Sequence, residues 1–196
     1  MATGGSSSRP VRSSRVRIIA GQWRGRFLEF QEADGLRPTG DRIRETLFNW
    51  LQPHLNGARC LDLFAGSGAL GFEAASRGAS AVTLVEQHPA TVAQLRQSAA
   101  RFQADQVTLR QMSALNFLAD GANSTMPYDL IFLDPPFASD LLQQCLEPLV
   151  DWPGWARTGL CYVEFPASQP PCIPEELNYW RQLRAGEVGF GLLRRI

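Results

Sequence analysis

The chain has 196 residues, a length that fits one large domain with room for a small appendage. Hydrophobic residues make up 44% of it, which is typical of a globular protein. No apolar run approaches the roughly 20 residues that span a bilayer, and the N-terminus lacks the apolar segment of a secretory signal. We therefore expect a cytoplasmic protein without membrane contact.

Charge is unevenly distributed along a chain whose formal net charge is zero. All 19 basic residues are Arg. Residues 1–44 carry nine Arg and four acidic residues, a balance of +5, so the remainder carries −5. A basic end on a neutral protein indicates contact with a polyanion, although a solvated tail is the simpler alternative.

The four cysteines predict no metal centre, because none of them shows the paired spacing of metal ligands. Cys60 and Cys161 lie inside apolar, strand-like runs. We expect both, together with Cys145 and Cys172, to be reduced thiols, as is usual for cytoplasmic proteins.

The N-terminal region divides into two parts. Residues 1–15 are nearly without core-forming side chains, which predicts a disordered tail. Residues 16–36 predict a small hairpin extension of two short strands, suited to contact with a nucleic acid. Trp23 and Arg24 fall in its turn, where an exposed ring and a cation would stack on a base and neutralise phosphate. A small packed cap is the alternative reading of this turn.

Residues 37–196 predict the main domain, which begins with a loop and a helix. Four apolar residues recur at helical spacing and predict one buried face: Ile43, Leu47, Trp50 and Leu51. Arg42 and Arg44 are expected to project from the first turn, a position that cations disfavour. An anionic group is therefore expected nearby. Pro53 is expected to end the helix.

From residue 58 onward, strands and helices alternate. The expected strands are 59–64, 81–86, 106–110, 128–133 and 159–164, and the expected helices are 69–77, 89–102, 113–119 and 139–150. This order predicts an α/β fold with a doubly wound, mostly parallel sheet. The runs 179–184 and 190–196 predict a C-terminal antiparallel hairpin, which brings the sheet to seven strands.

The first motif is Asp62–Gly71, Asp-Leu-Phe-Ala-Gly-Ser-Gly-Ala-Leu-Gly, which joins the first strand of this sheet to its helix. Its glycines permit a tight turn and close backbone approach beside a helix N-terminus. Glu86 ends the next strand, where a carboxylate can accept both ribose hydroxyls of a nucleoside. Because the spacing also matches the dinucleotide fingerprint, an NAD-dependent oxidoreductase is one hypothesis.

The second motif, Asp-Pro-Pro-Phe, follows a buried apolar strand. Two prolines force a stiff exit from the strand, which presents the carboxylate of Asp134, the carbonyl of Pro135 and the ring of Phe137. Two acceptors beside a stacking surface suit a flat heterocycle that bears an amino group. Both motifs should face one crevice at the switch point of the sheet. Asp62 inside its strand favours a cationic cofactor over a pyrophosphate there.

Together these motifs resemble the class I S-adenosylmethionine-dependent methyltransferases that modify exocyclic amino groups. Three N-terminal segments narrow the resemblance: Arg-Ile-Ile-Ala-Gly at 17–21, Trp-Arg-Gly-Arg at 23–26 and Arg-Pro-Thr-Gly-Asp-Arg-Ile-Arg-Glu-Thr-Leu-Phe at 37–48. With them, residues 16–196 resemble the bacterial 16S ribosomal RNA guanine-N2 methyltransferase family, the RsmD-like group. The resemblance implies the Rossmann-like class I fold, S-adenosylmethionine as cofactor, no metal, and methylation of N2 on a specific guanine of 16S ribosomal RNA.

The resemblance also implies which residues form the site. Asp134, Pro135 and Phe137 would be catalytic, the first two by holding the acceptor amine and the third by stacking on guanine. The implied cofactor-binding residues are Asp62, Ala65, Gly66 and Gly68 at the methionine part, with Phe64 in the same loop, Glu86 at the ribose, Ser113 and Ala114 at the adenine, and Thr39. Many relatives carry an acid at position 113, so the Ser113 hydroxyl or the Ala114 N–H would serve here.

The implied partner is ribosomal RNA, within a small-subunit particle or an assembly intermediate, bound by a monomeric enzyme. The implied RNA-binding residues are Arg15, Arg17, Trp23, Arg24, Arg26, Arg37 and Arg42. Methylation of another amino acceptor, adenine N6 or glutamine N5, is the alternative within the class. An NAD-dependent oxidoreductase and a non-catalytic RNA-binding module are the alternatives outside it.

Overall fold

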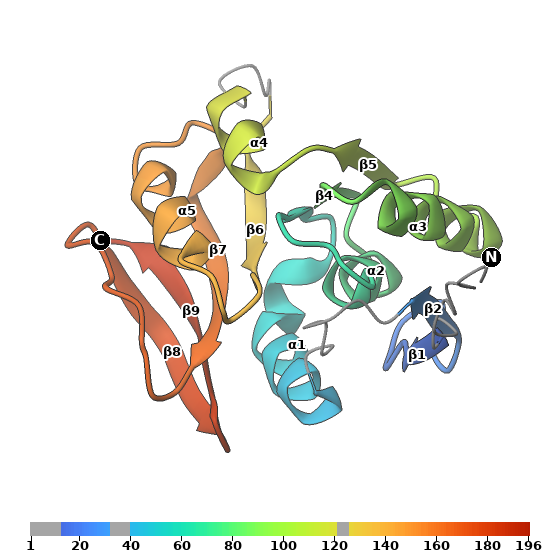
Figure 1. The fold of residues 1–196 in the computed structure, drawn as a ribbon, viewed down its shortest axis with the longest axis horizontal. Helices are drawn as coiled ribbons and strands as arrows, with labels where there is room; N and C mark the ends of the chain where they lie inside the picture. Colours follow the sequence, from blue (N-terminus) through green and yellow to red (C-terminus); the bar gives the residue numbers. More distant parts are fainter. Residues whose placement is uncertain (1–12, 32–39, 121–125) are drawn as a thin grey trace, which may run out of the picture.

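The computed structural model describes residues 13–31, 40–120 and 126–196 (Figure 1). The strands are β1 (Ser13–Arg17), β2 (Phe27–Gln31), β3 (Arg59–Asp62), β4 (Ala81–Glu86), β5 (Val107–Gln111), β6 (Tyr128–Leu133), β7 (Trp155–Pro166), β8 (Leu177–Ala185) and β9 (Val188–Arg195). The helices are α1 (Asp41–Leu55), α2 (Ala69–Ser76), α3 (Pro89–Phe102), α4 (Ala114–Asp120) and α5 (Leu141–Leu149). No helix among these is long and apolar enough to cross a membrane.

Seven strands form one sheet in the order β5-β4-β3-β6-β7-β9-β8. The first five of these run parallel to one another, whereas β9 runs antiparallel to both β7 and β8. The predicted doubly wound sheet with a C-terminal hairpin is therefore confirmed. Strand order reverses between β4-β3 and β6, which places the switch point at the pairing of β3 with β6.

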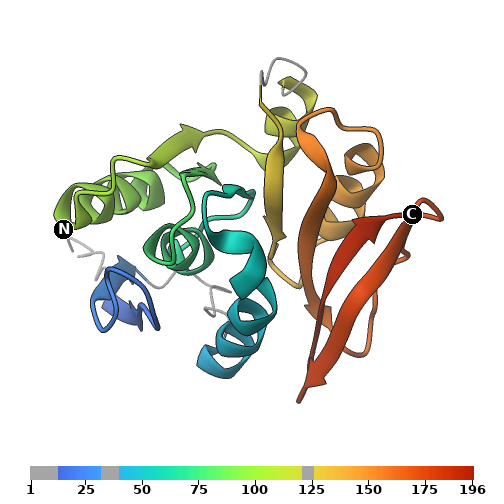
Figure 2. The same ribbon diagram turned by 180° about the vertical axis from the view of Figure 1, so that it is seen from behind.

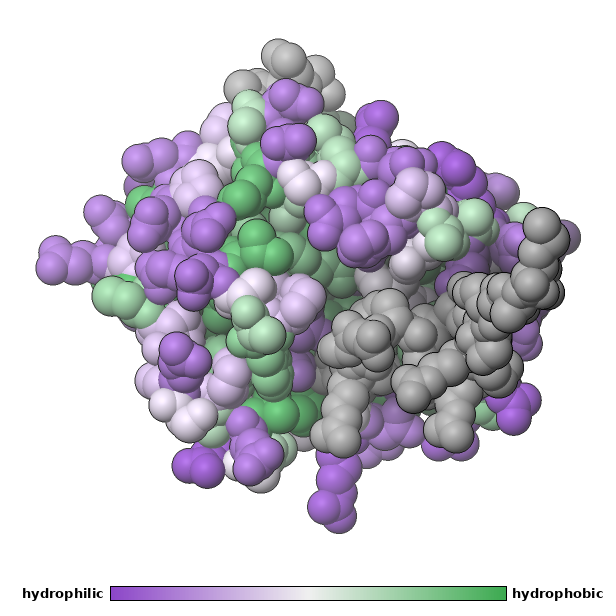
Figure 3. Space-filling model, viewed as in Figure 1, coloured by the Kyte–Doolittle hydropathy of each residue, from purple (hydrophilic) through white to green (hydrophobic). Residues whose placement is uncertain are grey.

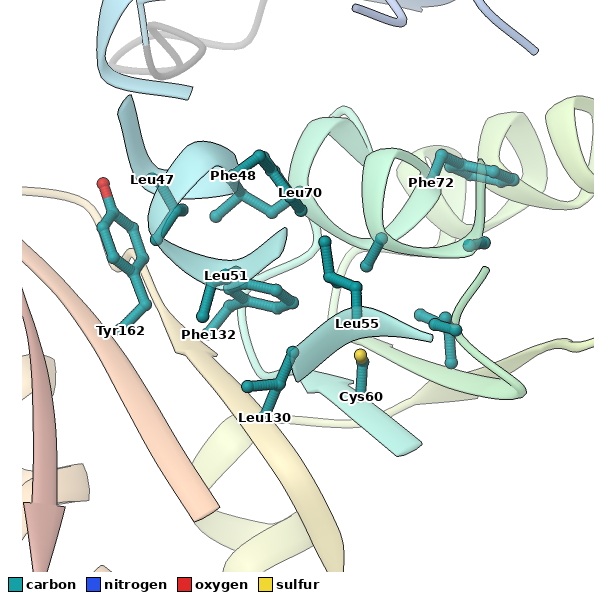
Figure 4. Packing of buried hydrophobic residues seen from close by; sticks show 14 of the residues in the cluster. Leu47, Phe48, Leu51, Leu55, Cys60, Leu70, Phe72, Leu130, Phe132 and Tyr162 are labelled. Atoms are coloured by element: carbon teal, nitrogen blue, oxygen red, sulfur yellow. The ribbon is translucent and has the colours of Figure 1, made fainter. Parts of the chain in front are cut away.

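Helices cover both faces of the sheet (Figures 1 and 2). On one face, α1, α2 and α3 pack over alternate residues of the sheet, as where Phe48 of α1 meets Phe132 of β6 with ring centroids 6.1 Å apart (Figure 4). The N-terminal hairpin packs on the outer side of α2 and α3. On the other face, α4 and α5 pack over the intervening residues, such as Ile131 and Leu133. Figure 3 shows an outer surface on which apolar residues gather through the middle, bordered by hydrophilic ones.

Helix α1 continues past Pro53 to Leu55, so the prediction that Pro53 ends the helix was wrong. A proline in the last turn removes one backbone hydrogen bond near an end that frays anyway. Leu51 and Leu55, on either side of it, have no exposed surface. The burial of these two side chains favours the helical conformation through the proline.

The N-terminal hairpin pairs β1 with β2, and β1 begins at Ser13 rather than at the predicted Val16. The expectation that Trp23 is exposed in its turn was wrong. Only 5% of Trp23 is exposed, and its ring packs 5.2 Å from that of Phe102 and edge-on to Phe72. Its backbone N–H donates to Oγ of Ser76 at 3.0 Å. The packed cap is the observed alternative, because α2 and α3 together form an aromatic pocket that a local sequence pattern does not reveal.

Arg44 does not project from α1, contrary to the prediction, but is fully buried. Its guanidinium donates to the carboxylate of Asp41 at 2.6 Å and to the carbonyl of Arg17 at 3.0 Å, and lies 3.8 Å from the buried carboxylate of Glu73. The anionic groups expected near the first turn are therefore side chains of the protein itself, Asp41 and Glu73. Arg42, by contrast, is exposed as predicted.

We predict that Trp23→Ala lowers the free energy of unfolding by about 3–5 kcal/mol, because it empties an aromatic pocket between two helices. The measurement is equilibrium denaturation in urea. Arg24→Ala, at an exposed position next along the chain, is the matched control and should change stability by less than about 0.5 kcal/mol. Equal effects of the two substitutions would contradict the packed role of Trp23.

Candidate active site

Four acidic residues lie at the carboxyl ends of four neighbouring strands. Glu86 ends β4 and Asp62 ends β3. Asp134 is the first residue after β6, and Glu164 lies on β7, one residue beyond its last pair with β6. Side chains alternate between the two faces of a strand, so all four acids fall on the same face as Cys60, Leu84, Phe132 and Tyr162, the face that α1 covers. The strands thus bring the acids to one end and one face of the sheet, at the switch point where open α/β sheets form their ligand crevice. This region is called the crevice below.

The glycine-rich loop between β3 and α2 lines this crevice. Gly66 and Gly68 have φ of +48° and +79°, values that side chains rarely tolerate. A Cβ atom on Gly68 would lie 2.6 Å from the ring of Phe72. The Ala65 N–H donates to the carbonyl of Val85 at 3.0 Å, so the loop is held against the end of β4 with its backbone facing the crevice.

Glu86 is half-buried at the end of β4 and is oriented by two backbone groups. One carboxylate oxygen accepts the Gly66 N–H at 3.1 Å and the other accepts the His88 N–H at 2.9 Å. A carboxylate has about four lone-pair sites, so two neutral donors leave capacity for the hydroxyls of a ribose. Glu86 therefore fits the predicted contact with a nucleoside.

Asp62 is almost fully buried, with 1% of its surface exposed. Its Oδ2 accepts the Gly71 N–H at 3.1 Å, whereas its Oδ1 has no hydrogen-bond partner among the described residues. Burial, and next the nearby charge of Asp134, raise the pKa of Asp62 from 3.8 to about 7. A buried carboxylate oxygen that lacks a donor and sits beside a second acid fits a cationic group such as an ammonium.

The Asp-Pro-Pro-Phe segment leaves β6 beside Asp62. Asp134 is half-buried, Pro135 is buried, and Phe137 is 43% exposed, an unusual position for a large aromatic ring. The backbone N–H and the hydroxyl of Ser139 both donate to the Pro136 carbonyl, at 3.1 and 2.6 Å, which fixes the turn. The exit from the strand is therefore rigid, and its ring is accessible for stacking.

Ser113 and Ala114 lie beyond the end of β5, next to Glu86. The Met112 N–H donates to the carbonyl of Glu86 at 3.1 Å, which ties this loop to β4. The Ser113 hydroxyl oxygen accepts the Asn116 N–H at 3.2 Å and so caps the first turn of α4. The structure thus places both predicted adenine contacts close to the predicted ribose contact. The Ser113 oxygen already accepts one hydrogen bond.

The predicted RNA-binding arginines lie along the hairpin, not all at the crevice. Val16 packs with Ala69 at the start of α2, so the adjacent Arg15 lies at the crevice end. The turn that holds Arg24 lies at the opposite end, beside Ser76. Arg15, Arg17, Arg24, Arg26 and Arg42 are exposed, whereas Trp23 is buried, and Thr39 and Arg37 lie outside the described residues.

Arg26 is anchored at the outer edge of α3. Its guanidinium donates to the Arg101 carbonyl at 2.7 Å and lies 4.3 Å from the centroid of the Phe102 ring. A cation over a ring with a fixed hydrogen bond stabilises the docking of the hairpin. Arg26 therefore has a structural contact besides any contact with RNA.

The sequence analysis did not predict a role for Tyr162 and Glu164 on β7. Both are buried, and the Tyr162 hydroxyl donates to Oε2 of Glu164 at 2.6 Å. Burial, with the charges of Glu164 and Asp134, raises the pKa of Tyr162 well above 10.0. The available signal was a Tyr and a Glu at alternate positions in an apolar strand that ends at the crevice, the same pattern that drew attention to Asp62.

The four cysteines are free thiols, as predicted, with Cys172 exposed and the others buried. Burial raises the pKa of Cys145 to about 12, which makes it an unreactive thiol. Among the described residues, no three His, Cys, Asp or Glu side chains are grouped so that they could hold a metal ion.

Comparison with known proteins places the chain in a family. Residues 16–194 match the model of a family described as conserved hypothetical protein 95. The chain belongs to this family. It is 44% identical to ribosomal RNA small subunit methyltransferase D of Escherichia coli, over 93% of this chain and 91% of that one, and 40% identical to the protein of that name in Haemophilus influenzae, over 93% and 95%.

A solved structure with 40% sequence identity shares the fold. An Escherichia coli protein provisionally described as a methyltransferase superposes with a TM-score of 0.82 at 40% identity, over 93% of this chain and 98% of that one. The resemblance to class I methyltransferases of the RsmD-like group, drawn from motifs, is confirmed. The NAD-dependent oxidoreductase hypothesis is set aside, because a buried acid at the glycine-rich loop suits a cation and not a pyrophosphate.

We predict that Asp62 gives the ligand-free protein a specific pH dependence. The folded chain, with the Asp62 pKa near 7, holds a proton that the unfolded chain, with a pKa near 3.8, releases. Stability from this group is therefore complete below about pH 4 and is lost as the pH rises to about 7. Urea denaturation should show the free energy of unfolding of the wild type falling over this range relative to Asp62→Asn. A constant difference between the two proteins would mean that Asp62 ionises normally.

Proposed function

We propose that this protein transfers the methyl group of S-adenosylmethionine to the exocyclic N2 of a guanine in 16S ribosomal RNA. One observation carries this proposal: the pairing of β3 with β6 sets Asp62, which suits an ammonium group, beside Asp134, which suits an acceptor amine. Relatives at 40–44% identity are named small-subunit ribosomal RNA methyltransferases, which supports the same class of reaction.

The crevice offers a complementary group for each part of the cofactor. The buried Oδ1 of Asp62 would accept a hydrogen bond from the ammonium of the methionine part, while the backbone of Ala65, Gly66 and Gly68 would line that part. Glu86 would accept the ribose hydroxyls. Four further contacts with the cofactor remain predictions: Phe64, Thr39 and, at the adenine, Ser113 and Ala114. When bound, S-adenosylmethionine supplies a methyl group already activated by the sulfonium.

The acceptor side of the crevice would hold the amine for attack. An exocyclic amine is a poor nucleophile, because its lone pair is delocalised into the ring. Hydrogen bonds from its two N–H groups to the Asp134 carboxylate and the Pro135 carbonyl would favour a pyramidal nitrogen. Phe137 would stack on the base, which is worth about 1–3 kcal/mol. Alignment of nitrogen and methyl group can supply about 7–11 kcal/mol of the barrier reduction.

A guanine inside folded RNA has to leave its stack to reach this crevice. Arg15, Arg17 and Arg42 lie exposed on β1 and at the start of α1, where they would contact phosphates around the extruded base. Arg24 and Arg26 would contact more distant parts of the RNA. We propose a monomer that acts in the cytoplasm on a small-subunit particle or an assembly intermediate.

We predict that Asp134→Ala slows single-turnover methyl transfer by about a hundredfold or more, because one oriented acceptor at the reacting atom is lost. Calorimetric binding of S-adenosylmethionine should change little. Asp140→Ala, an exposed acid six residues further along, is the matched control and should retain the wild-type rate. Near-normal transfer by Asp134→Ala would overturn the mechanism.

Nucleoside analysis of the product tests the acceptor assignment separately. The substrate is ribosomal RNA, free or in particles, from cells that lack this protein, and N2-methylguanine is the expected product. N6-methyladenine in its place would overturn the guanine assignment while leaving the reaction class intact.

We predict that Arg15→Ala weakens RNA binding and reduces the slope of log K against log salt by about 1, because one phosphate contact is lost. Arg157→Ala removes an equal charge from an exposed position near the start of β7, at the end of the parallel strands away from the crevice. This control should leave the slope unchanged. An identical slope in both variants and the wild type would show that β1 makes no phosphate contact.

A further inference from the structure

Glu164 occupies a place in the crevice that the reaction described above does not use. The parallel register of β6 and β7 pairs Leu133 with Val163, so Asp134, the first residue beyond β6, lies next to Glu164 of β7. The charges of both acids act on the same side chain, Tyr162. Neighbouring strands lie about 4.8 Å apart. Side-chain alternation directs both acids to the face of Phe132 and Tyr162. Glu164 is therefore the neighbour of the residue that would hold the acceptor amine.

The carboxylate of Glu164 is held in a fixed orientation. Glu164 is 5% exposed, and its Oε2 accepts the hydroxyl hydrogen of Tyr162 at 2.6 Å. The Tyr162 ring is itself fixed between Phe132 and Phe190, with centroids 6.4 and 6.5 Å away. A carboxylate has about four lone-pair sites, and the Tyr162 hydroxyl fixes the direction in which those of Glu164 point. Glu164 is thus a preoriented acceptor and not a mobile surface charge.

We propose that Glu164 is a specificity-determining residue that accepts the N1–H of the target guanine. The proposal rests on the proposed function, guanine N2 methylation. On the Watson–Crick edge of guanine, the N1–H lies next to the N2 amine, so two adjacent donors face acceptors on two adjacent strands. Adenine carries a lone pair at N1, which a carboxylate repels. Asp134 would hold the amine, and Glu164 would select the base that bears it.

The test replaces the target guanine in a small-subunit RNA by 2-aminopurine, which keeps the 2-amino group, lacks O6 and has a lone pair at N1. The wild-type protein should methylate the guanine RNA about ten- to a hundredfold faster than the 2-aminopurine RNA in single turnover. In Glu164→Gln, the amide can accept from N1–H or donate to N1, while any contact with O6 is unchanged. The rate ratio should therefore fall well below that of the wild type, with a slower reaction on guanine.

Tyr162→Phe is the matched control, because it removes the orienting hydroxyl but keeps the carboxylate. It should slow the reaction on guanine and preserve the preference for guanine over 2-aminopurine. A wild-type ratio near one overturns the proposal without any variant, even if Glu164→Gln fails to fold. An unchanged ratio in a Glu164→Gln protein that binds S-adenosylmethionine calorimetrically overturns it too.

These outcomes are distinct from failure of the proposed function. Absence of N2-methylguanine from the wild-type product would refute the guanine assignment itself. N2-methylguanine formed without discrimination at N1 would refute only the role of Glu164.

Discussion

The arrangement of the N-terminal half depends on one buried carboxylate, that of Glu73 in α2. It has no exposed surface, and it accepts the N–H groups of Ile19 at 2.7 Å and Ala20 at 3.0 Å and the Arg77 guanidinium at 2.6 Å. Arg44 of α1 lies 3.8 Å away. Loss of one partner of such a buried network is costly, because the others remain desolvated. Glu73 thus joins the hairpin, α1 and α2 into one unit.

This unit determines what surrounds the crevice. With α1 held by Arg44, its apolar residues Leu47, Phe48 and Leu51 stay packed on the sheet face that carries the four acids. The hairpin, fixed at Ile19 and Ala20, lies along α2 and brings Arg15 toward the crevice end, while Arg24 lies at the opposite end. The parts that we propose to bind RNA and the cofactor therefore share one support.

The crevice itself concentrates negative charge. Glu86, Asp62, Asp134 and Glu164 lie on four successive strands and on one face, and the mutual repulsion of Asp62 and Asp134 contributes to the raised pKa of Asp62. Such clustering is unfavourable in the empty protein and becomes favourable when donors and a cation enter. The proposed ligands supply these groups in order across the sheet: ribose hydroxyls, an ammonium, an amine and an imino N–H.

The sequence by itself determined the sheet, its helices and the residues at the strand ends, because apolar runs, glycines and prolines act locally through backbone conformation. It also predicted that Asp62, Glu86 and Asp134 lie together at the site, because their charges interrupt or end apolar strands. Only the tertiary structure showed that Trp23 and Arg44 are buried, because the side chains that cover them come from distant parts of the chain. It alone revealed the pair of Tyr162 and Glu164, because the register of β6 with β7, and not spacing in the sequence, sets Glu164 beside Asp134.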